Sequence, residues 1–227
     1  MVKKISQFSV IIRTKNEERW IGHAIQSVLD NLYKPEIIII DNESNDKTID
    51  IVKHFIEAPK LSNKSENYTN IKIFNIKNYS PGKSLNIGAK KSTRKYLMIL
   101  SAHCVLKQYK ENSVINALKK NVCVFGKQVP IWNGKKISKR YIWSHFGEKK
   151  IRNLFSKLED RYFLHNALAI YTKKILKKFP FDETLTGKED RYWADTIINK
   201  DLNYLYDPEL VCEHHYTSNG NTWKGLA

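Results

Sequence analysis

Residues 96–105 read Tyr-Leu-Met-Ile-Leu-Ser-Ala-His-Cys-Val, and this stretch decides the fold. Its first five residues form an apolar run that stops abruptly at Ser101. A run this short, preceded by a segment with helical spacing, predicts a strand that is buried on both faces. Open α/β sheets bind ligands at the carboxyl ends of their strands. We therefore expect Ser101 and His103 to form the floor of a site on which other segments converge.

Three further strands and helices precede this stretch. Apolar runs at 8–12, 36–40 and 71–76 are each followed by polar residues, and helical spacing is found at 20–29, 49–56 and 83–93. Residues 58–70 are polar and predict a surface loop, and Pro81-Gly82 predicts a turn. Repeated strand–helix units that end in a strand predict a parallel, doubly wound sheet whose loops meet at one edge.

The pattern changes after Val105. We expect helices at 113–120 and 189–199, and strands at 122–126, 167–171 and 202–206, the last leading to the pair His214-His215. Between 132 and 161 basic residues alternate with aromatic ones. With no internal repeat and no low-complexity linker in view, the second half is expected to pack on the first as one domain.

The composition is that of a globular protein. The chain has 227 residues, 41% of them hydrophobic and 11% aromatic, which excludes an intrinsically disordered chain. Lys and Arg outnumber Asp and Glu by 39 to 23, giving a net charge of +16. This excess favours anionic partners such as nucleotides, acidic lipids, acidic glycans or nucleic acid. The chain is rich in Lys, Ile and Asn throughout, so compositional bias alone could supply much of the charge.

The cysteines and the termini bear on the compartment. Three scattered cysteines suit free thiols in a reducing cytosol. Arg13 interrupts the first apolar stretch, which argues against a signal peptide, and no apolar run approaches the length of a membrane span. We expect a cytoplasmic protein, soluble or peripheral at the inner face of the membrane.

Four motifs follow one another at predicted strand ends or helix starts. They are Ser-Val-Ile-Ile-Arg-Thr-Lys-Asn-Glu at 9–17, Ile-Asp-Asn-Glu-Ser-Asn-Asp-Lys-Thr at 40–48, Gly-Lys-Ser-Leu-Asn-Ile-Gly at 82–88 and Gly-Lys-Glu-Asp at 187–190. Together they resemble the family-2 glycosyltransferases of the GT-A fold over nearly the whole chain. The resemblance implies an α/β, Rossmann-like fold with a mostly parallel central sheet flanked by helices. Residues 1–105 would bind the nucleotide sugar, and residues 106–227 would form a smaller region for the acceptor and the catalytic base.

The resemblance also implies a UDP-sugar-like donor and a set of residues that hold it. These are Thr14, Asn16, Glu17, Asp41, Lys83, Asn86 and Ser101. Asp41 would contact a uracil-like base, and Lys83 at a helix start would meet the diphosphate, where amides and positive charge coincide. Each residue also has an ordinary structural explanation. Asp41 could cap the next helix. Thr14, Asn16 and Glu17 could simply be polar residues of a surface loop, and Lys83 could be a solvated surface lysine.

Asp190 is the predicted catalytic base. A carboxylate that begins a helix beside the cleft can take the proton of the acceptor hydroxyl during in-line displacement with inversion. Glu189 would orient the acceptor or the base, and Trp193 would stack on a sugar or fill the core. The alternative is that both acids merely favour the helix dipole.

One departure concerns the metal. The family's Asp-x-Asp motif falls at Ser101-Ala102-His103, where neither carboxylate is present. His103, joined by His214 or His215, could hold a divalent ion, with Mn²⁺ favoured over Mg²⁺ because imidazole suits transition metals. Alternatively, lysines and arginines replace the metal.

The acceptor is expected to be a glycan or a lipid-linked molecule in the synthesis of a surface polysaccharide or glycolipid. The segment from Trp132 to Arg161 would then lie on an anionic membrane, or would simply be a solvated charged face. Two other functions stay open, namely a catalytically lapsed nucleotide-sugar binder and a basic nucleic-acid-binding module. We expect no nucleic-acid partner, because no recognised binding signature is present.

Overall fold

The computed structural model describes residues 5–61, 70–137 and 141–220. Its first part alternates strands and helices. In chain order these are β1 (Phe8–Thr14), α1 (Ile21–Asn31), β2 (Glu36–Asp41), α2 (Thr48–Leu61), β3 (Asn70–Asn75), α3 (Pro81–Lys91) and β4 (Tyr96–Leu100). The four strands pair in parallel in the order β3-β2-β1-β4. The predicted parallel arrangement is therefore confirmed for this part of the chain.

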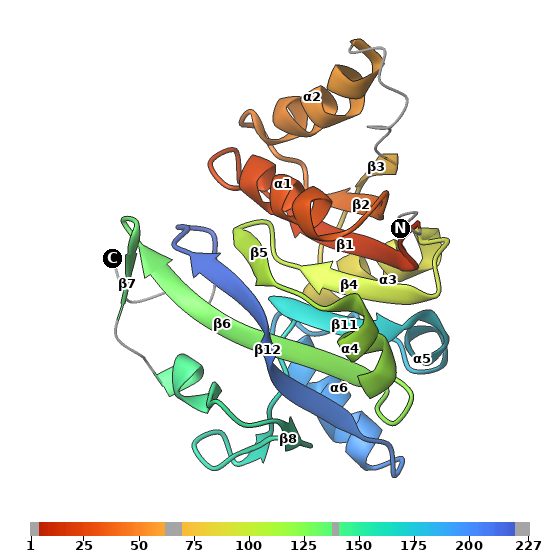
Figure 1. Cartoon of the computed structure of the whole chain (residues 1–227), viewed down its shortest axis with the longest axis vertical. Coiled ribbons are helices and arrows are strands. Elements are labelled where there is room, and N and C mark those ends of the chain that lie inside the picture. The colour runs from red at the N-terminus through yellow and green to blue at the C-terminus, as the bar shows by residue number, and fades with distance from the viewer. Residues whose placement is uncertain (1–4, 62–69, 138–140, 221–227) are drawn as a thin grey trace.

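The second part extends the same sheet. Its elements are β5 (Cys104–Gln108), α4 (Glu111–Ala117), β6 (Cys123–Trp132), β7 (Lys135–Lys136), the 3₁₀ helix η2 (Tyr141–His145), β8 (Ile151–Arg152), β9 (Phe155–Ser156), β10 (Arg161–Tyr162), β11 (Leu168–Thr172), α5 (Lys173–Lys178), α6 (Glu189–Ile198) and β12 (Tyr204–His215). The sheet runs β3-β2-β1-β4-β11-β6-β12-β5. β11 is antiparallel to both β4 and β6, while β12 is parallel to β6. Figure 1 shows β6 and β12 as long strands that cross each other in the view.

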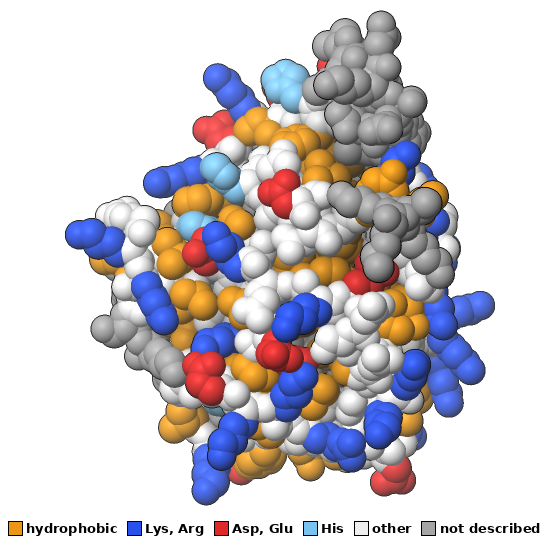
Figure 2. All heavy atoms as spheres, viewed as in Figure 1, with side chains coloured by type: hydrophobic (Ala, Val, Ile, Leu, Met, Phe, Trp, Pro, Cys, Tyr) orange, Lys and Arg blue, Asp and Glu red, His pale blue; other side chains and the backbone are white. Residues whose placement is uncertain are grey.

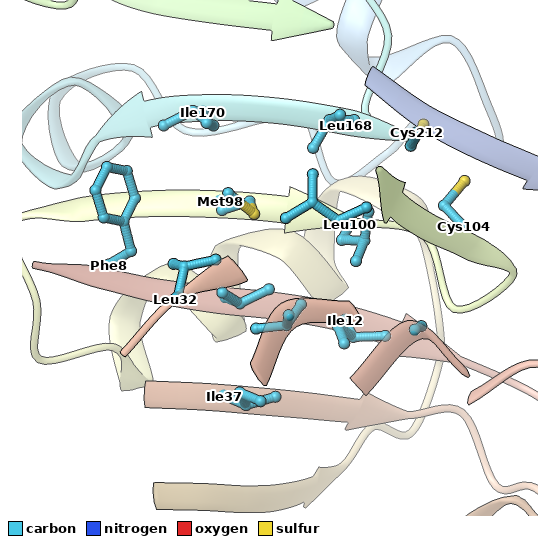
Figure 3. Close-up of a cluster of buried hydrophobic side chains, with 14 of the residues drawn as sticks. Phe8, Ile12, Leu32, Ile37, Met98, Leu100, Cys104, Leu168, Ile170 and Cys212 are labelled. Carbon is cyan, nitrogen blue, oxygen red and sulfur yellow. The ribbon is translucent and has the colours of Figure 1, made fainter. Parts of the chain in front are cut away.

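Helices cover both faces of the sheet, which explains the continuous apolar strands. On one face α1 packs its buried residues, among them Ile25 and Val28, against Val10 and Ile12 of β1. Figure 3 shows part of this cluster, in which Leu100 of β4 and Leu168 of β11 lie together. On the other face Ile11 and Leu97 pack with buried residues of α3, α5 and α6. Strands that are covered twice need apolar side chains at every position.

Several predicted boundaries were wrong. Residues 58–61, Ala-Pro-Lys-Leu, continue α2 instead of beginning a loop. Residues 62–69 lie outside the described part. Pro81 opens α3 and does not make a turn, since Ser80 caps the helix by accepting a hydrogen bond from the amide of Lys83 (3.2 Å). The predicted strand at 122–126 continues to Trp132.

None of the described helices is both long enough and apolar enough to cross a membrane.

Candidate nucleotide-sugar site

A cavity of about 570 Å³ opens where the strands β1 and β4 end. Its walls come from the loop after β1, the turn after β4, the segment before β11 and the first residues of α6. Ser101 and His103 lie on its wall together with Glu189 and Asp190. The structure thus brings together the strand end and the acidic pair that the sequence separates by almost ninety residues.

The two acids at the start of α6 have different partners. Oε1 of the buried Glu189 accepts a hydrogen bond from the guanidinium of Arg13 (2.9 Å), at the end of β1. Asp190 accepts hydrogen bonds from the amides of Asn166 (3.1 Å) and Arg191 (2.9 Å). Opposite charge beside Arg13 raises the pKa of its guanidinium, although burial alone would lower it. The pair is therefore held rigidly, and Asp190 keeps its face toward the cavity.

Asn166 and Arg191 support this arrangement. The side-chain amide of Asn166 reaches Glu189 (3.4 Å), and its carbonyl oxygen accepts a bond from the hydroxyl of Tyr171 (2.7 Å). Arg191 lies over the ring of Phe163 (4.1 Å) and contacts Asp190 (3.1 Å). Burial disfavours its charge, but the neighbouring carboxylates raise the pKa of Arg191 above its ordinary value. A permanent cation thus stands beside the acidic group.

The loops after β1 and β2 are fastened to each other. Ser44 donates its hydroxyl proton to Asp41 (2.6 Å) and accepts a hydrogen bond from the amide of Asn16 (2.9 Å). Asn16 lies in the left-handed region (φ 51°), and its side-chain oxygen Oδ1 accepts a hydrogen bond from the backbone amide of Asn45 (2.9 Å). Asp46 accepts bonds from the amides of Thr48 and Glu18, so it is the residue that caps α2. Asp41 is buried inside this network and not on the cavity wall.

Three other predicted donor residues, Asn16, Lys83 and Asn86, also lie off the cavity wall. The Lys83 ammonium donates to the carbonyl oxygens of Lys77 (3.0 Å) and Asn78 (3.2 Å). Asn86 exchanges hydrogen bonds with the backbone of Phe181 and thereby joins α3 to the loop before α6. Thr14 and Glu17 do line the cavity. Trp193 is buried in the core, where its indole donates to the carbonyl of Phe179.

The two histidines predicted as metal ligands are neighbours. Their rings stack with centroids 4.8 Å apart, and both line the cavity. Nδ1 of His103 lies 3.1 Å from the carboxylate of Glu17, and Nδ1 of His214 lies 2.5 Å from Oε1 of Gln128. Both acceptors require a proton on Nδ1. Burial, reinforced by the nearby histidines, lowers the pKa of His214 well below its ordinary value, so that ring is neutral.

The residues present do not complete a metal site. Across the described residues, no three His, Cys, Asp or Glu side chains are arranged to hold an ion. His215 does not join the pair, because its ring stacks on Trp20 (4.1 Å) and is absent from the cavity wall. Basic side chains are instead present on that wall, namely Arg13, Lys15, Lys188 and Arg191.

Some cavity residues were not predicted. Asn166, Glu159 and His165 lie between β9 and β11, in a segment whose sequence has no helical or strand periodicity. His165 accepts a bond from the amide of Ala167 and donates from Nε2 to the carbonyl of Gly126 (2.8 Å). Burial lowers its pKa to about 3, which keeps the ring neutral. Only the three-dimensional path of the chain reveals these neighbours.

The chain combines a Rossmann-like sheet with a cavity in which an acidic pair and the ends of β1 and β4 meet. The model of glycosyl transferase family 2 matches residues 9–180, which is most of the chain. The chain therefore belongs to glycosyl transferase family 2.

Three comparisons give the range of similarity. The dolichyl N-acetyl-alpha-D-glucosaminyl phosphate 3-beta-D-2,3-diacetamido-2,3-dideoxy-beta-D-glucuronosyltransferase of Methanococcus voltae is 31% identical over 103 residues, which are 44% of this chain and 30% of that protein. S. aureus TarS 1-349 in complex with UDP-GlcNAc superposes with a TM-score of 0.70 at 19% identity, covering 98% of this chain and 62% of that one. The mannosyltransferase PcManGT of Pyrobaculum calidifontis, in complex with GDP-Man and Mn²⁺, superposes with a TM-score of 0.64 at 17% identity. The superposition covers 96% of this chain and 59% of that one.

These likenesses confirm the predicted GT-A fold. They also show that this chain spans less than two thirds of each of the three proteins.

Proposed function

We propose that the chain transfers a sugar from a nucleotide-diphosphate donor to a hydroxyl of a glycan or lipid-linked acceptor, with inversion at the anomeric carbon. The observation that carries this proposal is the shared cavity of Asp190 and the carboxyl ends of β1 and β4. A nucleotide sugar placed along the strand ends would present its anomeric carbon toward α6. We assign Asp190 as the carboxylate that acts at that position.

The chemistry follows from the positions of these groups. The acceptor oxygen attacks the anomeric carbon while the bond from that carbon to the diphosphate oxygen breaks. The acceptor proton passes to a carboxylate oxygen of Asp190, and the electron pair of the broken bond leaves on the diphosphate. Glu189 forms an ion pair with Arg13 (2.9 Å). We therefore propose that Glu189 orients the acceptor or the base and does not itself take the proton.

Charge on the departing diphosphate needs a counter-charge. The solved mannosyltransferase contains Mn²⁺, but the described residues of this chain do not complete an ion site. We assign this role to basic side chains of the cavity wall, of which Lys15 and Lys188 are exposed enough to move onto a ligand. Transfer should then persist in EDTA and change by less than about twofold on adding Mn²⁺ or Mg²⁺. Loss of transfer in EDTA with recovery in Mn²⁺ would instead support the metal site predicted at His103 and His214.

The first experiment identifies the reaction. Purified protein is incubated with a panel of UDP-, GDP- and TDP-sugars, with and without candidate glycan acceptors, and the products are read by mass spectrometry. We expect sugar transfer or slow donor hydrolysis with one nucleotide class. Calorimetric titration of the matching nucleoside diphosphate should show binding, and titration with RNA should not.

Two other functions have specific signatures in these experiments. A catalytically lapsed binder, which the missing Asp-x-Asp carboxylates favour, would bind the nucleotide and yield no product from any acceptor. A basic nucleic-acid-binding module would bind RNA with a steep salt dependence and ignore nucleotides.

A further inference from the structure

Glu159 is a cavity residue whose carboxylate accepts no hydrogen bond from the described residues. It lies in the short loop between β9 and β10, and its side chain is only 6% exposed. Within the described part of the chain, neither carboxylate oxygen accepts a hydrogen bond, although both are inaccessible to solvent. Native proteins pair nearly all such buried groups, and an unpaired one costs on the order of 1–3 kcal/mol. The carboxylate therefore requires an explanation.

Its one charged neighbour does not supply that explanation. Nη2 of Arg191 lies 3.5 Å from Oε1 of Glu159, which balances the charge but is too long for a good hydrogen bond. Nη1 of Arg191 donates to the carbonyl of Leu164 (2.7 Å) and lies 3.1 Å from Oδ1 of Asp190. The guanidinium thus stands between two carboxylates, and Glu159 and Asp190 both line the same cavity.

A ligand bound in the cavity can supply the missing donors. A carboxylate whose charge is already balanced attracts neutral donors more than a second cation, and sugar hydroxyls are such donors. Because one guanidinium separates Glu159 from Asp190, a molecule with one hydroxyl at Asp190 would bring a second hydroxyl to Glu159.

We propose that Glu159 recognises the acceptor, by accepting a hydrogen bond from a sugar hydroxyl beside the one that reacts at Asp190. This inference rests on the proposed function and specifies its acceptor as a polyhydroxylated sugar ring. It makes Glu159 a specificity-determining residue, because an acceptor without the second hydroxyl would leave the buried carboxylate unpaired.

The test uses three proteins, which are the wild type, Glu159→Gln and the matched control Asp160→Asn. Asp160 is the exposed neighbour of Glu159, has the same charge and adopts a left-handed conformation (φ 48°) that Asn tolerates. Binding of methyl glycosides of glucose, galactose, mannose and N-acetylglucosamine is measured by saturation-transfer NMR in the presence of UDP or GDP. Nucleotide affinity is measured separately by calorimetry.

We expect at least one methyl glycoside to bind the wild type and Asp160→Asn, and its affinity for Glu159→Gln to fall about tenfold or more. Nucleotide affinity should be equal in all three proteins. Equal glycoside binding by the wild type and Glu159→Gln, or binding of no glycoside by the wild type, would overturn the inference. Absence of nucleotide binding in the wild type would instead overturn the proposed function, so the two failures are distinguishable.

Discussion

Glu189 and Asp190 show how adjacent residues of one type acquire different roles. Both begin α6 and both are buried, but Glu189 faces the cation of Arg13, 176 positions earlier in the chain. Asp190 is held by backbone amides and by its neighbour Arg191. The helix dipole explains why acids occur at this position. Both acids line the cavity, and their partners differ: Arg13 ties Glu189 to β1, whereas Asn166 and Arg191 hold Asp190.

The ion pair of Arg13 and Glu189 can be tested by a double-mutant cycle. Arg13→Met leaves the buried Glu189 carboxylate without its partner and should lower the free energy of unfolding by about 3–5 kcal/mol. Glu189→Gln leaves an Arg13 side chain that is 23% exposed and partly solvated, so it should cost less. The double variant should lose less than the sum of the two, because it leaves no such charge. Urea unfolding measures all three losses. Strict additivity would show that the two groups are not coupled.

At the level of elements, α3 lies very close to β1. A Cβ added at Gly88 of α3 would lie 2.5 Å from Cγ2 of Ile11 in β1. Gly88→Ala should therefore destabilise the protein by about 1–3 kcal/mol through overpacking. Gly147 has open space around it, and Gly147→Ala is the matched control with a change within about 0.5 kcal/mol. Thermal or urea unfolding provides the comparison, and equal stabilities of the two variants would contradict the close packing.

β2 begins at a buried carboxylate that ties several elements together. Glu36 accepts bonds from Ser9 (2.5 Å) in β1, from Lys72 (2.8 Å) in β3 and from the amide of Thr93 (2.7 Å) before β4. Burial alone would raise the pKa of Glu36, but these donors outweigh it and lower the pKa below its ordinary value of 4.5.

This shift predicts a pH-dependent stability. The ionised form is favoured in the folded state, so its contribution is complete above about pH 4.5 and is lost as the pH falls through the lowered pKa. Glu36→Gln should cost about 1–3 kcal/mol at pH 7, and this difference from the wild type should shrink below pH 4.5. Urea unfolding across pH measures it, with the exposed Glu57→Gln in α2 as the control. A difference that stays constant with pH would contradict the assignment.

The elements also show what the sequence could predict. The parallel strands were found because helices cover both of their faces, so each is a continuous apolar run such as residues 96–100. β12 was found only in part, since Pro208 and a register shift between Asp207 and Val211 break its pattern. α5 was missed because six residues with two buried apolar positions, Ile175 and Leu176, show no clear period. Asn166 and Glu159 were missed because their segment is irregular and their neighbours are distant in sequence.

On the scale of the whole molecule, the excess of 16 positive charges is widely spread. Figure 2 shows Lys and Arg side chains interspersed with hydrophobic and acidic ones over one face. The segment that leads to Glu159 also exposes Ile151, Phe155 and Leu158, by 36%, 46% and 68%. Lys149, Arg152 and Lys157 are exposed beside them in the sequence. We propose that this segment, residues 149–158, rests on an anionic membrane surface, where a lipid-linked acceptor would be found.

Vesicle sedimentation tests this surface. The wild type should bind vesicles of equal parts phosphatidylcholine and phosphatidylglycerol, and should release them as salt is raised. The double change Phe155→Ser and Leu158→Ser should weaken binding by about tenfold or more, since it removes apolar area that would be buried. Ile5→Ser, at an exposed position before β1, is the control. Two results would contradict the proposal and indicate a solvated face. One is that the wild type binds pure phosphatidylcholine vesicles as well as the mixed vesicles, and the other is that the double variant binds the mixed vesicles as well as the wild type.

The central claim is that residues far apart in the chain form one cavity for an activated sugar, with Asp190 as the base. Its most direct test measures two quantities for Asp190→Asn, the rate of sugar transfer and the affinity for the nucleotide. The control is Asp201→Asn, because Asp201 is exposed and lies beyond the end of α6. We expect Asp190→Asn to lose about 10²–10⁴-fold in turnover. Its affinity for the nucleoside diphosphate should stay at the wild-type value. The control should match the wild type in both turnover and nucleotide affinity. Turnover by Asp190→Asn at the wild-type rate would contradict the claim.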